Sequence, residues 1–145
     1  IVGCGRIGIE VAKRAKGFDM QVLYYDLVRR TSEEEKELGL EFVSTLQELL
    51  SRADFVTIHT SLTAETHHLI STAEFAAMKP TAILINAARG PIIDQKALYQ
   101  ALKSRQIFAA ALDVTEVEPI PPDDSLLTLD NVIIAPHIAG ASGRS

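Results

Sequence analysis

The sequence predicts a doubly wound α/β domain with a parallel sheet, and three observations carry this prediction. Apolar runs of strand length alternate with amphipathic segments of helix length along the chain. Several runs are apolar at consecutive positions, such as residues 82–85, which is typical of strands covered on both faces. A glycine-rich turn, GCGRIG, separates the first run from the first helical segment. Repeated strand–helix–strand units with right-handed crossovers form a parallel sheet.

The elements can be placed in chain order from local signals. The expected strands are residues 1–3, 21–26, 41–43, 54–60, 82–87, 108–114 and 132–135. A helix over residues 7–16 follows the glycine turn. Later helix starts are predicted by capping-box spacing, which occurs at Ser32 with Glu35, Thr45 with Glu48, and Ser71 with Glu74.

Glycine and proline set the ends of these elements. Gly17 and Gly39 stand where helices should stop, and Pro80 prevents a helix from continuing beyond Met78. The proline-rich stretch 118–124 is expected to be a loop rather than a domain boundary, because a further strand must still join the sheet. A helix is also expected after Ser142.

Composition narrows the classes of function. Apolar residues make up 47% of the 145 residues and charged residues 23%, which is typical of a globular protein. A net charge of −5 gives no positive field for nucleic acid or an acidic membrane. The single cysteine, Cys4, suits a reducing cytoplasm, and no apolar run reaches the roughly 20 residues that span a bilayer. A start at Ile-Val-Gly indicates a piece of a longer protein, so an upstream targeting segment stays an open question.

The glycine turn predicts a dinucleotide site. Gly3 would permit the tight turn, Gly5 would let the backbone approach a pyrophosphate, and Gly8 would let helix and strand pack closely. The amides of Arg6 and Ile7 would face the phosphates at the helix N-terminus. By itself a GxGxxG sequence can be a structural turn, but here it follows a strand and opens a helix.

An acid at the end of the next strand points to the cofactor. Asp26 lies 18 residues after Gly8, where a carboxylate accepts hydrogen bonds from the adenosine ribose. Its charge would repel a 2′-phosphate, so we expect NAD rather than NADP. Arg29 and Arg30 are close enough to soften this preference.

Three further residues each follow an apolar run: Arg89 in NAARG, Glu118 in DVTEVEP and His137 in APHIAG. An arginine can bind a carboxylate with two hydrogen bonds, and a histidine can transfer protons near neutral pH. Taken singly, each has a plainer interpretation. Arg89 can be a surface arginine, Glu118 part of a solvated acidic loop, and His137 a structural histidine.

The order and spacing of several motifs decide between these alternatives. GCGRIG, HTSLTAET, MKPTAILINAARG, ALDVTEVEP and APHIAG occur in an order and spacing that resemble the D-isomer-specific 2-hydroxyacid dehydrogenases. Within that family the chain is most similar to the glyoxylate/hydroxypyruvate reductase and phosphoglycerate dehydrogenase branches. The resemblance covers residues 1–145 and implies the Rossmann-like dinucleotide-binding domain of a two-domain protein, truncated at both ends and without the substrate domain.

The resemblance implies hydride transfer between NAD(H) and a small D-2-hydroxy acid or 2-oxo acid, such as glyoxylate, hydroxypyruvate or a 3-phosphoglycerate-like compound. Arg89 matches the arginine that binds the substrate carboxylate and polarises the carbonyl. His137 matches the acid–base, and Glu118 matches the acid that hydrogen-bonds and orients it. The three catalytic residues implied are therefore Arg89, Glu118 and His137.

The resemblance also implies a nicotinamide side of the site. Asp113 matches the residue that meets the nicotinamide carboxamide, and the remaining lining residues are Thr60, Ala87, Ala88, Arg89, His137 and Gly140. His59 either touches the cofactor or packs at its strand end, and packing is favoured. His67 and His68 have no partner at metal-ligand spacing, so they are expected to be exposed, and no metal site is predicted.

Other classes stay open. Formate dehydrogenases share the fold but resemble the family with glutamine at the position of Glu118, so Glu118 argues against them. C-terminal-binding corepressors are similar to these dehydrogenases, keep such a trio, and sense nucleotides as interaction proteins. The resemblance also implies a homodimer through this domain. Because catalysis needs a closed cleft between two domains, we expect the 145 residues alone to bind NAD with negligible turnover and to self-associate.

Overall fold

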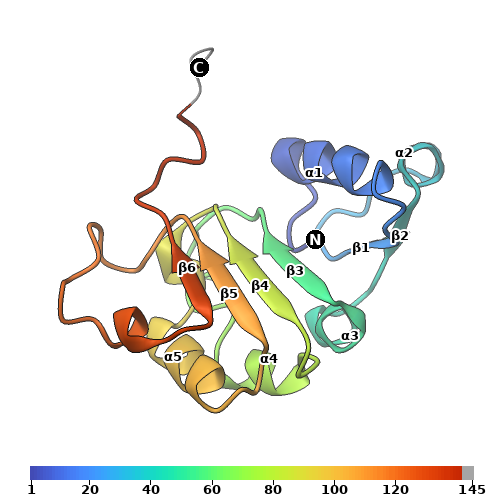
Figure 1. The fold of residues 1–145 in the computed structure, drawn as a ribbon. Helices are drawn as coiled ribbons and strands as arrows, with labels where there is room; N and C mark the ends of the chain where they lie inside the picture. Colours follow the sequence, from blue (N-terminus) through green and yellow to red (C-terminus); the bar gives the residue numbers. More distant parts are fainter. Residues whose placement is uncertain (142–145) are drawn as a thin grey trace.

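A central parallel sheet organises the chain. The computed structural model describes residues 1–141. Its larger sheet has the order β3-β4-β5-β6, and every pair in it is parallel. Figure 1 shows these strands side by side, with their arrows pointing the same way. The strand bounds are β3 Phe55–Ile58, β4 Ile83–Asn86, β5 Ala109–Leu112 and β6 Val132–Ile134.

Val2 joins a second pair of strands to this sheet. Strands β1 (Val22–Tyr24) and β2 (Leu40–Phe42) are parallel to each other. Val2 bridges in parallel to Tyr25 on one side and to Ile58 on the other. The spatial order is therefore β2-β1-Val2-β3-β4-β5-β6, with the winding direction reversing at Val2. This confirms the doubly wound parallel fold, although the strand predicted over residues 1–3 is reduced to a bridge at Val2.

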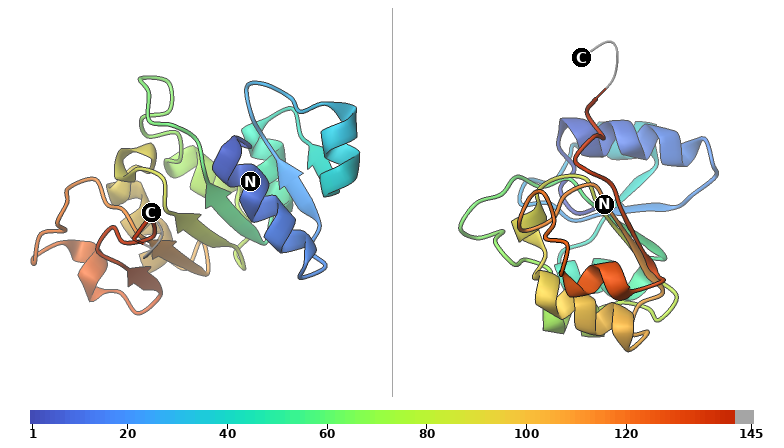
Figure 2. Two further views of the ribbon diagram at one scale, coloured as in Figure 1. Left: turned by 90° about the horizontal axis from the view of Figure 1, so that it is seen from above. Right: turned by 60° about the vertical axis from the view of Figure 1, so that its left-hand side comes forward.

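The crossover helices change face at that reversal. Figures 1 and 2 show α1 and α2 on one side of the sheet and α3, α4 and α5 on the other. This is the arrangement that right-handed crossovers produce on the two sides of a switch point. The helix bounds are α1 Arg6–Lys16, α2 Ser32–Leu38, α3 Leu46–Arg52, α4 Thr72–Ala77 and α5 Gln95–Lys103, with 3-10 turns at Gly90–Ile92 and Ser125–Thr128.

One predicted cap is shifted. The capping box of α2 is Thr31 with Glu34 rather than Ser32 with Glu35. The reason is that the Glu35 carboxylate accepts hydrogen bonds from Tyr24 and Arg29 instead, at 2.8 and 2.9 Å. Gly39 ends this helix with φ of +67°, a conformation that suits glycine.

The two later capping predictions are met in part. Thr45 Oγ1 accepts from the Glu48 amide at 3.2 Å, but the Glu48 carboxylate pairs with Arg52. The Ser71 amide donates to the Glu74 carboxylate at 3.1 Å. The helix α4 ends at Ala77, before Pro80, as predicted. The helix expected after Ser142 lies outside the described residues.

The core lies on the face that α3, α4 and α5 cover. Alternate strand residues point into it, and they are Val56, Ile58, Leu84, Ala110 and Leu112, all buried. On the other face Phe55 is 49% exposed and Ile133 is 72% exposed. The prediction of strands covered on both faces is therefore met only in part, because Ile83 and Ile85 of β4 are half-buried while Phe55 and Ile133 are exposed. In the same residues no helix is long and apolar enough to cross a membrane.

Candidate active site

The carboxyl ends of the sheet strands bring the predicted site residues to one edge. Thr60 follows β3, residues 87–89 follow β4, residues 113–118 follow β5, and His137 follows β6. Parallel strands place their carboxyl ends together, beside the switch point of the fold. Thr60 and residues 87–89 therefore line a cleft beside the glycine turn, whereas Glu118 and His137 line a second cleft.

The glycine turn is built as its spacing predicts. Gly3 has φ of +86°, and a Cβ there would lie 2.6 Å from the Thr60 amide nitrogen. A Cβ at Gly8 would lie 2.5 Å from the Gly3 carbonyl oxygen, so this position needs glycine for close packing. A Cβ at Gly5 would meet nothing within 4 Å. The open space at Gly5 lies at the start of α1, whose first amides, including those of Arg6 and Ile7, point out of the helix.

Asp26 is held against this turn. Its carboxylate accepts from the amide of Cys4 at 2.6 Å and from the amide of Val28 at 3.3 Å. Arg29 is bound to Glu35 through two nitrogens, whereas the guanidinium of Arg30 donates to the Cys4 carbonyl. The acid and Arg30 therefore both lie beside the glycine turn, and Arg29 does not. The open space at Gly5, which can receive a phosphate, and the nearby carboxylate of Asp26 together fit an NAD molecule.

Cys4 lies inside this turn and is buried. Burial raises the pKa of its thiol, with the Arg30 charge opposing that rise. A buried thiol with a raised pKa is a poor nucleophile, so Cys4 acts as a small packing residue in this turn.

A cleft separates the glycine turn from the end of β4. It is lined by Ile7, His59, Thr60, Ser61, Leu62, Ala87, Ala88 and Arg89. His59 bonds through Nε2 to the Thr57 hydroxyl at 2.8 Å, and burial lowers the pKa of its ring. A neutral, tethered His59 agrees with the packing role predicted for it.

Arg89 is presented by a turn that Asn86 builds. The Asn86 side chain donates to the Arg89 carbonyl and accepts from the Ala88 amide, both at 3.0 Å. Asn86 is fully buried, and Arg89 is exposed with its guanidinium resting on the Ala88 carbonyl at 2.6 Å. The buried side chain of Asn86 thus fixes the backbone of this turn, and the exposed guanidinium of Arg89 lines the cleft. Sequence reasoning missed Asn86, whose only signal is a polar residue ending an apolar run.

His137 and Glu118 meet as predicted, although 19 positions separate them in the chain. His137 Nδ1 donates to Glu118 Oε2 at 2.6 Å, and the side chains are 51% and 38% exposed. Glu118 Oε1 accepts from the Thr115 amide at 3.2 Å. The pair lines a second cleft together with Asp113, Ile134 and neighbouring residues.

Asp113 shapes the turn that carries His137. Its carboxylate accepts from the amides of Ala139 and Ile138 at 2.8 and 2.9 Å, and these bonds lower the pKa of Asp113. Its carbonyl accepts from the His137 amide at 2.9 Å, and His137 has φ of +56°. Gly140 lies in the next turn, which the bond from the Ala141 amide to the Ile138 carbonyl closes. The structure thus gives Asp113 a supporting role that the sequence did not indicate.

The expectation that His68 is exposed is wrong, because its side chain is half-buried and pairs with a carboxylate. His68 Nε2 lies 2.7 Å from Glu116 Oε1, 48 positions along the chain. Glu116 likewise does not belong to a solvated acidic run, because it also accepts from the Gln95 amide at 3.0 Å. No local spacing could indicate a pair so distant in sequence.

The fold and this edge define a dinucleotide-binding domain. The chain belongs to the family of D-isomer specific 2-hydroxyacid dehydrogenases, because residues 1–139 match the NAD-binding domain of that family. Its cofactor is NAD(H).

Relatives of this chain agree with the family assignment. It is 58% identical over 142 residues to a glyoxylate reductase of Korarchaeum cryptofilum, covering 98% of this chain and 42% of the relative. It is 52% identical to a D-3-phosphoglycerate dehydrogenase of Methanocaldococcus jannaschii, covering 98% of this chain and 26% of the relative. The apo D-mandelate dehydrogenase of Rhodotorula graminis superposes with a TM-score of 0.92 at 44% identity, covering 97% and 41% of the two chains. The chain thus spans less than half the length of these relatives.

Proposed function

We propose that this chain is the cofactor-binding part of an NAD-dependent oxidoreductase that interconverts a small D-2-hydroxy acid and its 2-oxo acid. Glyoxylate and hydroxypyruvate are the substrates we expect first, with 3-phosphoglycerate-like acids next. The observation that carries the proposal is the 2.6 Å bond between His137 and Glu118 at the sheet edge that also presents Arg89. The names of the relatives support the same class of reaction.

Two side chains of this chain, Arg89 and His137, act on the substrate in this proposal. NADH, when bound, supplies the hydrogen and the two electrons that reduce the carbonyl carbon. The Arg89 guanidinium binds the substrate carboxylate with two hydrogen bonds and polarises the neighbouring carbonyl. Protonated His137 gives its proton to the oxygen as negative charge develops there, and takes it back in the reverse reaction.

Glu118 decides which nitrogen of His137 can serve. The carboxylate accepts from Nδ1, which leaves Nε2 as the nitrogen free for the substrate. Glu118 therefore orients His137 and fixes which ring nitrogen faces the substrate.

Cofactor contacts complete the proposal. Asp26 would bind the ribose hydroxyls, and the first turn of α1 would bind the pyrophosphate. The proposed phosphate side comprises Gly3, Gly5, Arg6, Ile7 and Gly8, and the proposed nicotinamide side comprises Thr60, Ala87, Ala88, Asp113 and Gly140. Asp26→Ser should narrow the preference for NADH over NADPH, which fluorescence titration of both cofactors measures. Equal affinities for the two cofactors in the unaltered protein would contradict the role of Asp26.

Assembly and location belong to the proposal as well. The substrate domain would lie in the remainder of the longer protein, and the dinucleotide-binding domain at residues 1–145 would form a homodimer in the cytoplasm. The single buried cysteine agrees with a reducing compartment. The molar mass of the full-length protein by light scattering would test the dimer, and a monomeric mass would contradict it.

Turnover by the full-length protein tests the function. Purified protein mixed with NADH and glyoxylate, or with NADH and hydroxypyruvate, should consume NADH at a rate followed by absorbance. The matched control is His137→Ala, which should bind NADH as the unaltered protein does. Binding of NADH without turnover of any 2-oxo acid would contradict the enzyme and favour a nucleotide-sensing interaction protein.

A further inference from the structure

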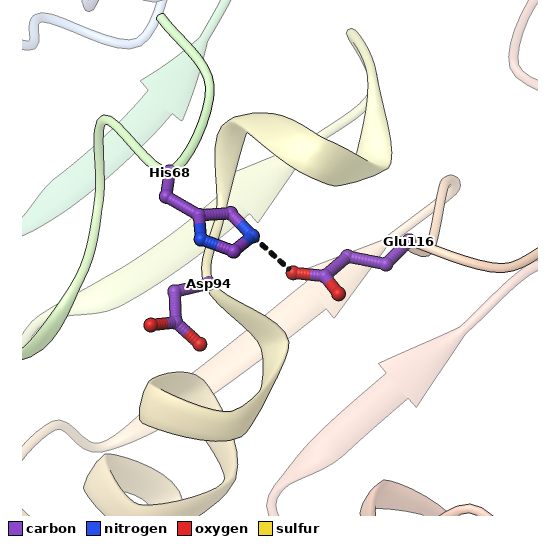
Figure 3. Close-up of side chains that lie close together, drawn as sticks. All are labelled: His68, Asp94 and Glu116. Carbon is purple, nitrogen blue, oxygen red and sulfur yellow. Dashed lines mark hydrogen bonds and ion pairs between the residues drawn. The ribbon is translucent and has the colours of Figure 1, made fainter.

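A second histidine–carboxylate pair, His68 and Glu116, lies next to the proposed catalytic pair, because Glu116 belongs to the loop that carries Glu118. Figure 3 shows the His68 ring pointing at the Glu116 carboxylate, with Asp94 below them. His68 Nε2 donates to Glu116 Oε1 at 2.7 Å, and the side chains are 38% and 30% exposed. Glu116 stands two residues before Glu118, so whatever fixes Glu116 also fixes the loop that carries Glu118.

Several protein groups donate hydrogen bonds to the carboxylates of Glu116 and Asp94. Glu116 Oε1 also accepts from the Gln95 amide at 3.0 Å, and the Glu116 amide donates to the Gln95 side chain at 3.0 Å. Asp94 accepts from the amides of Lys96 and Ala97 at 3.1 Å and from the Ser71 hydroxyl at 2.9 Å. Protein donors thus bond to both oxygens of Asp94 and to Oε1 of Glu116, so that the cluster ties the loop of Glu116 to the start of α5.

The backbone at His68 ties this cluster to the loop of Arg89. The His68 amide donates to the Pro91 carbonyl at 2.8 Å, and the Ile70 amide donates to the Ile92 carbonyl at 3.1 Å. His68 therefore lies along the segment that directly follows Arg89, while its ring reaches the loop of Glu118.

The two loops also touch each other without spare room. A Cβ at Gly90 would overlap the carbonyl of Thr115. The Thr115 amide, in turn, donates to Glu118 Oε1 at 3.2 Å. A displacement of Glu116 would thus reach Glu118 through Thr115.

We propose that His68 is a positioning residue for the reaction: by holding Glu116 it keeps Glu118 directed at His137. The path runs from the His68 ring to Glu116, then through the Thr115 amide to Glu118 and His137. This inference rests on the proposed function, since it assigns His68 a part in the same site.

The test compares two substitutions of His68 in the full-length protein. His68 has φ of +53°, which asparagine tolerates well, so His68→Asn keeps the backbone and removes the reach to Glu116. His68→Gln places an amide donor at about the reach of Nε2 and serves as the rescue. Loss of one positioning hydrogen bond should lower kcat of His68→Asn about three- to tenfold, with NADH affinity unchanged.

A merely structural role would lower thermal stability without moving two further readouts. In His68→Asn the alkaline limb of the pH profile of reduction should shift to lower pH, because the charge of Glu118 is no longer held 2.6 Å from His137 Nδ1. The low-field proton resonance of the His137 ring N–H, bonded to Glu118, should broaden or vanish. His68→Gln should restore both, and Glu116→Gln, as a second variant from the other side of the pair, should repeat both losses.

The outcomes separate the two proposals. Absence of turnover in the unaltered protein would overturn the proposed function, and the resonance would then decide the role of His68 by itself. An unchanged resonance in His68→Asn, with unaltered kcat and pH profile wherever turnover exists, would overturn the positioning role. The shift in His68→Asn together with recovery in His68→Gln is the result we expect.

Discussion

Two histidine–glutamate pairs use the same short loop for different purposes. His137 and Glu118 lie 2.6 Å apart and His68 and Glu116 lie 2.7 Å apart, so distance does not distinguish them. The surroundings of the two pairs do distinguish them. His137 is 51% exposed at a cleft, whereas Glu116 is also bonded to the start of α5 through Gln95.

The difference teaches how much each pair can contribute to stability and to chemistry. An exposed ion pair stabilises a fold by only about 0–1 kcal/mol, but it leaves a ring nitrogen free to react. A pair enclosed by further hydrogen bonds has little freedom to react, and breaking it leaves donors without acceptors. Activity should therefore depend mainly on the first pair and stability mainly on the second.

The largest expected effect is on turnover. His137→Ala in the full-length protein should lower kcat by about 10²–10⁴, the usual contribution of a positioned acid–base. The affinity for NADH, measured by fluorescence, and the melting temperature should change little. A fall of less than about tenfold would remove His137 from the acid–base role and leave the two pairs indistinguishable.

The second prediction concerns stability, which should depend more on the His68–Glu116 pair than on the His137–Glu118 pair. Glu116→Ala should lower the free energy of unfolding by about 1–3 kcal/mol, because the Gln95 amide and the His68 ring lose their shared acceptor. Glu118→Ala should lower it by less, since His137 is exposed and only the Thr115 amide loses its acceptor. Urea unfolding of both variants measures the difference, and equal destabilisation would break the comparison.

The smallest expected effect concerns the turn that supports the first pair. The amides of Ala139 and Ile138 lower the pKa of Asp113 from its ordinary value of 3.8. A depressed pKa means that this stabilisation is present above pH 3.8 and is lost as the pH falls through the lower folded value. Asp113→Asn should therefore melt below the unaltered protein near neutral pH, and the gap should close in acid. A gap independent of pH would contradict this role.

Sequence reasoning reached the parts of the molecule that local patterns control. The glycine turn, the positions of the strands from residue 21 onward along the chain, and the end of α2 at Gly39 each depend on residues close in the chain, and the structure agrees with them. The meeting of Glu118 with His137 came from motifs in family register rather than from local chemistry.

Other features could not be predicted because tertiary contacts decide them. The His68–Glu116 pair joins residues 48 positions apart. Glu35 was assigned to a cap, yet the structure gives it to Arg29 and Tyr24. Consecutive apolar residues predicted covered strands, but Ile133 is 72% exposed, since a sequence pattern does not show what packs on each face of a strand.

The most direct test of the account is the pH profile of kcat/KM for reduction in Glu118→Gln. Glutamine keeps the size of the side chain and removes the negative charge that lies 2.6 Å from His137 Nδ1, so the alkaline limb of the profile should move to lower pH. The matched control is Asp123→Asn, an exposed acid of the same loop, which should leave the profile in place. A Glu118→Gln profile that coincides with that of the unaltered protein would contradict the claim that the charge of Glu118 acts on His137.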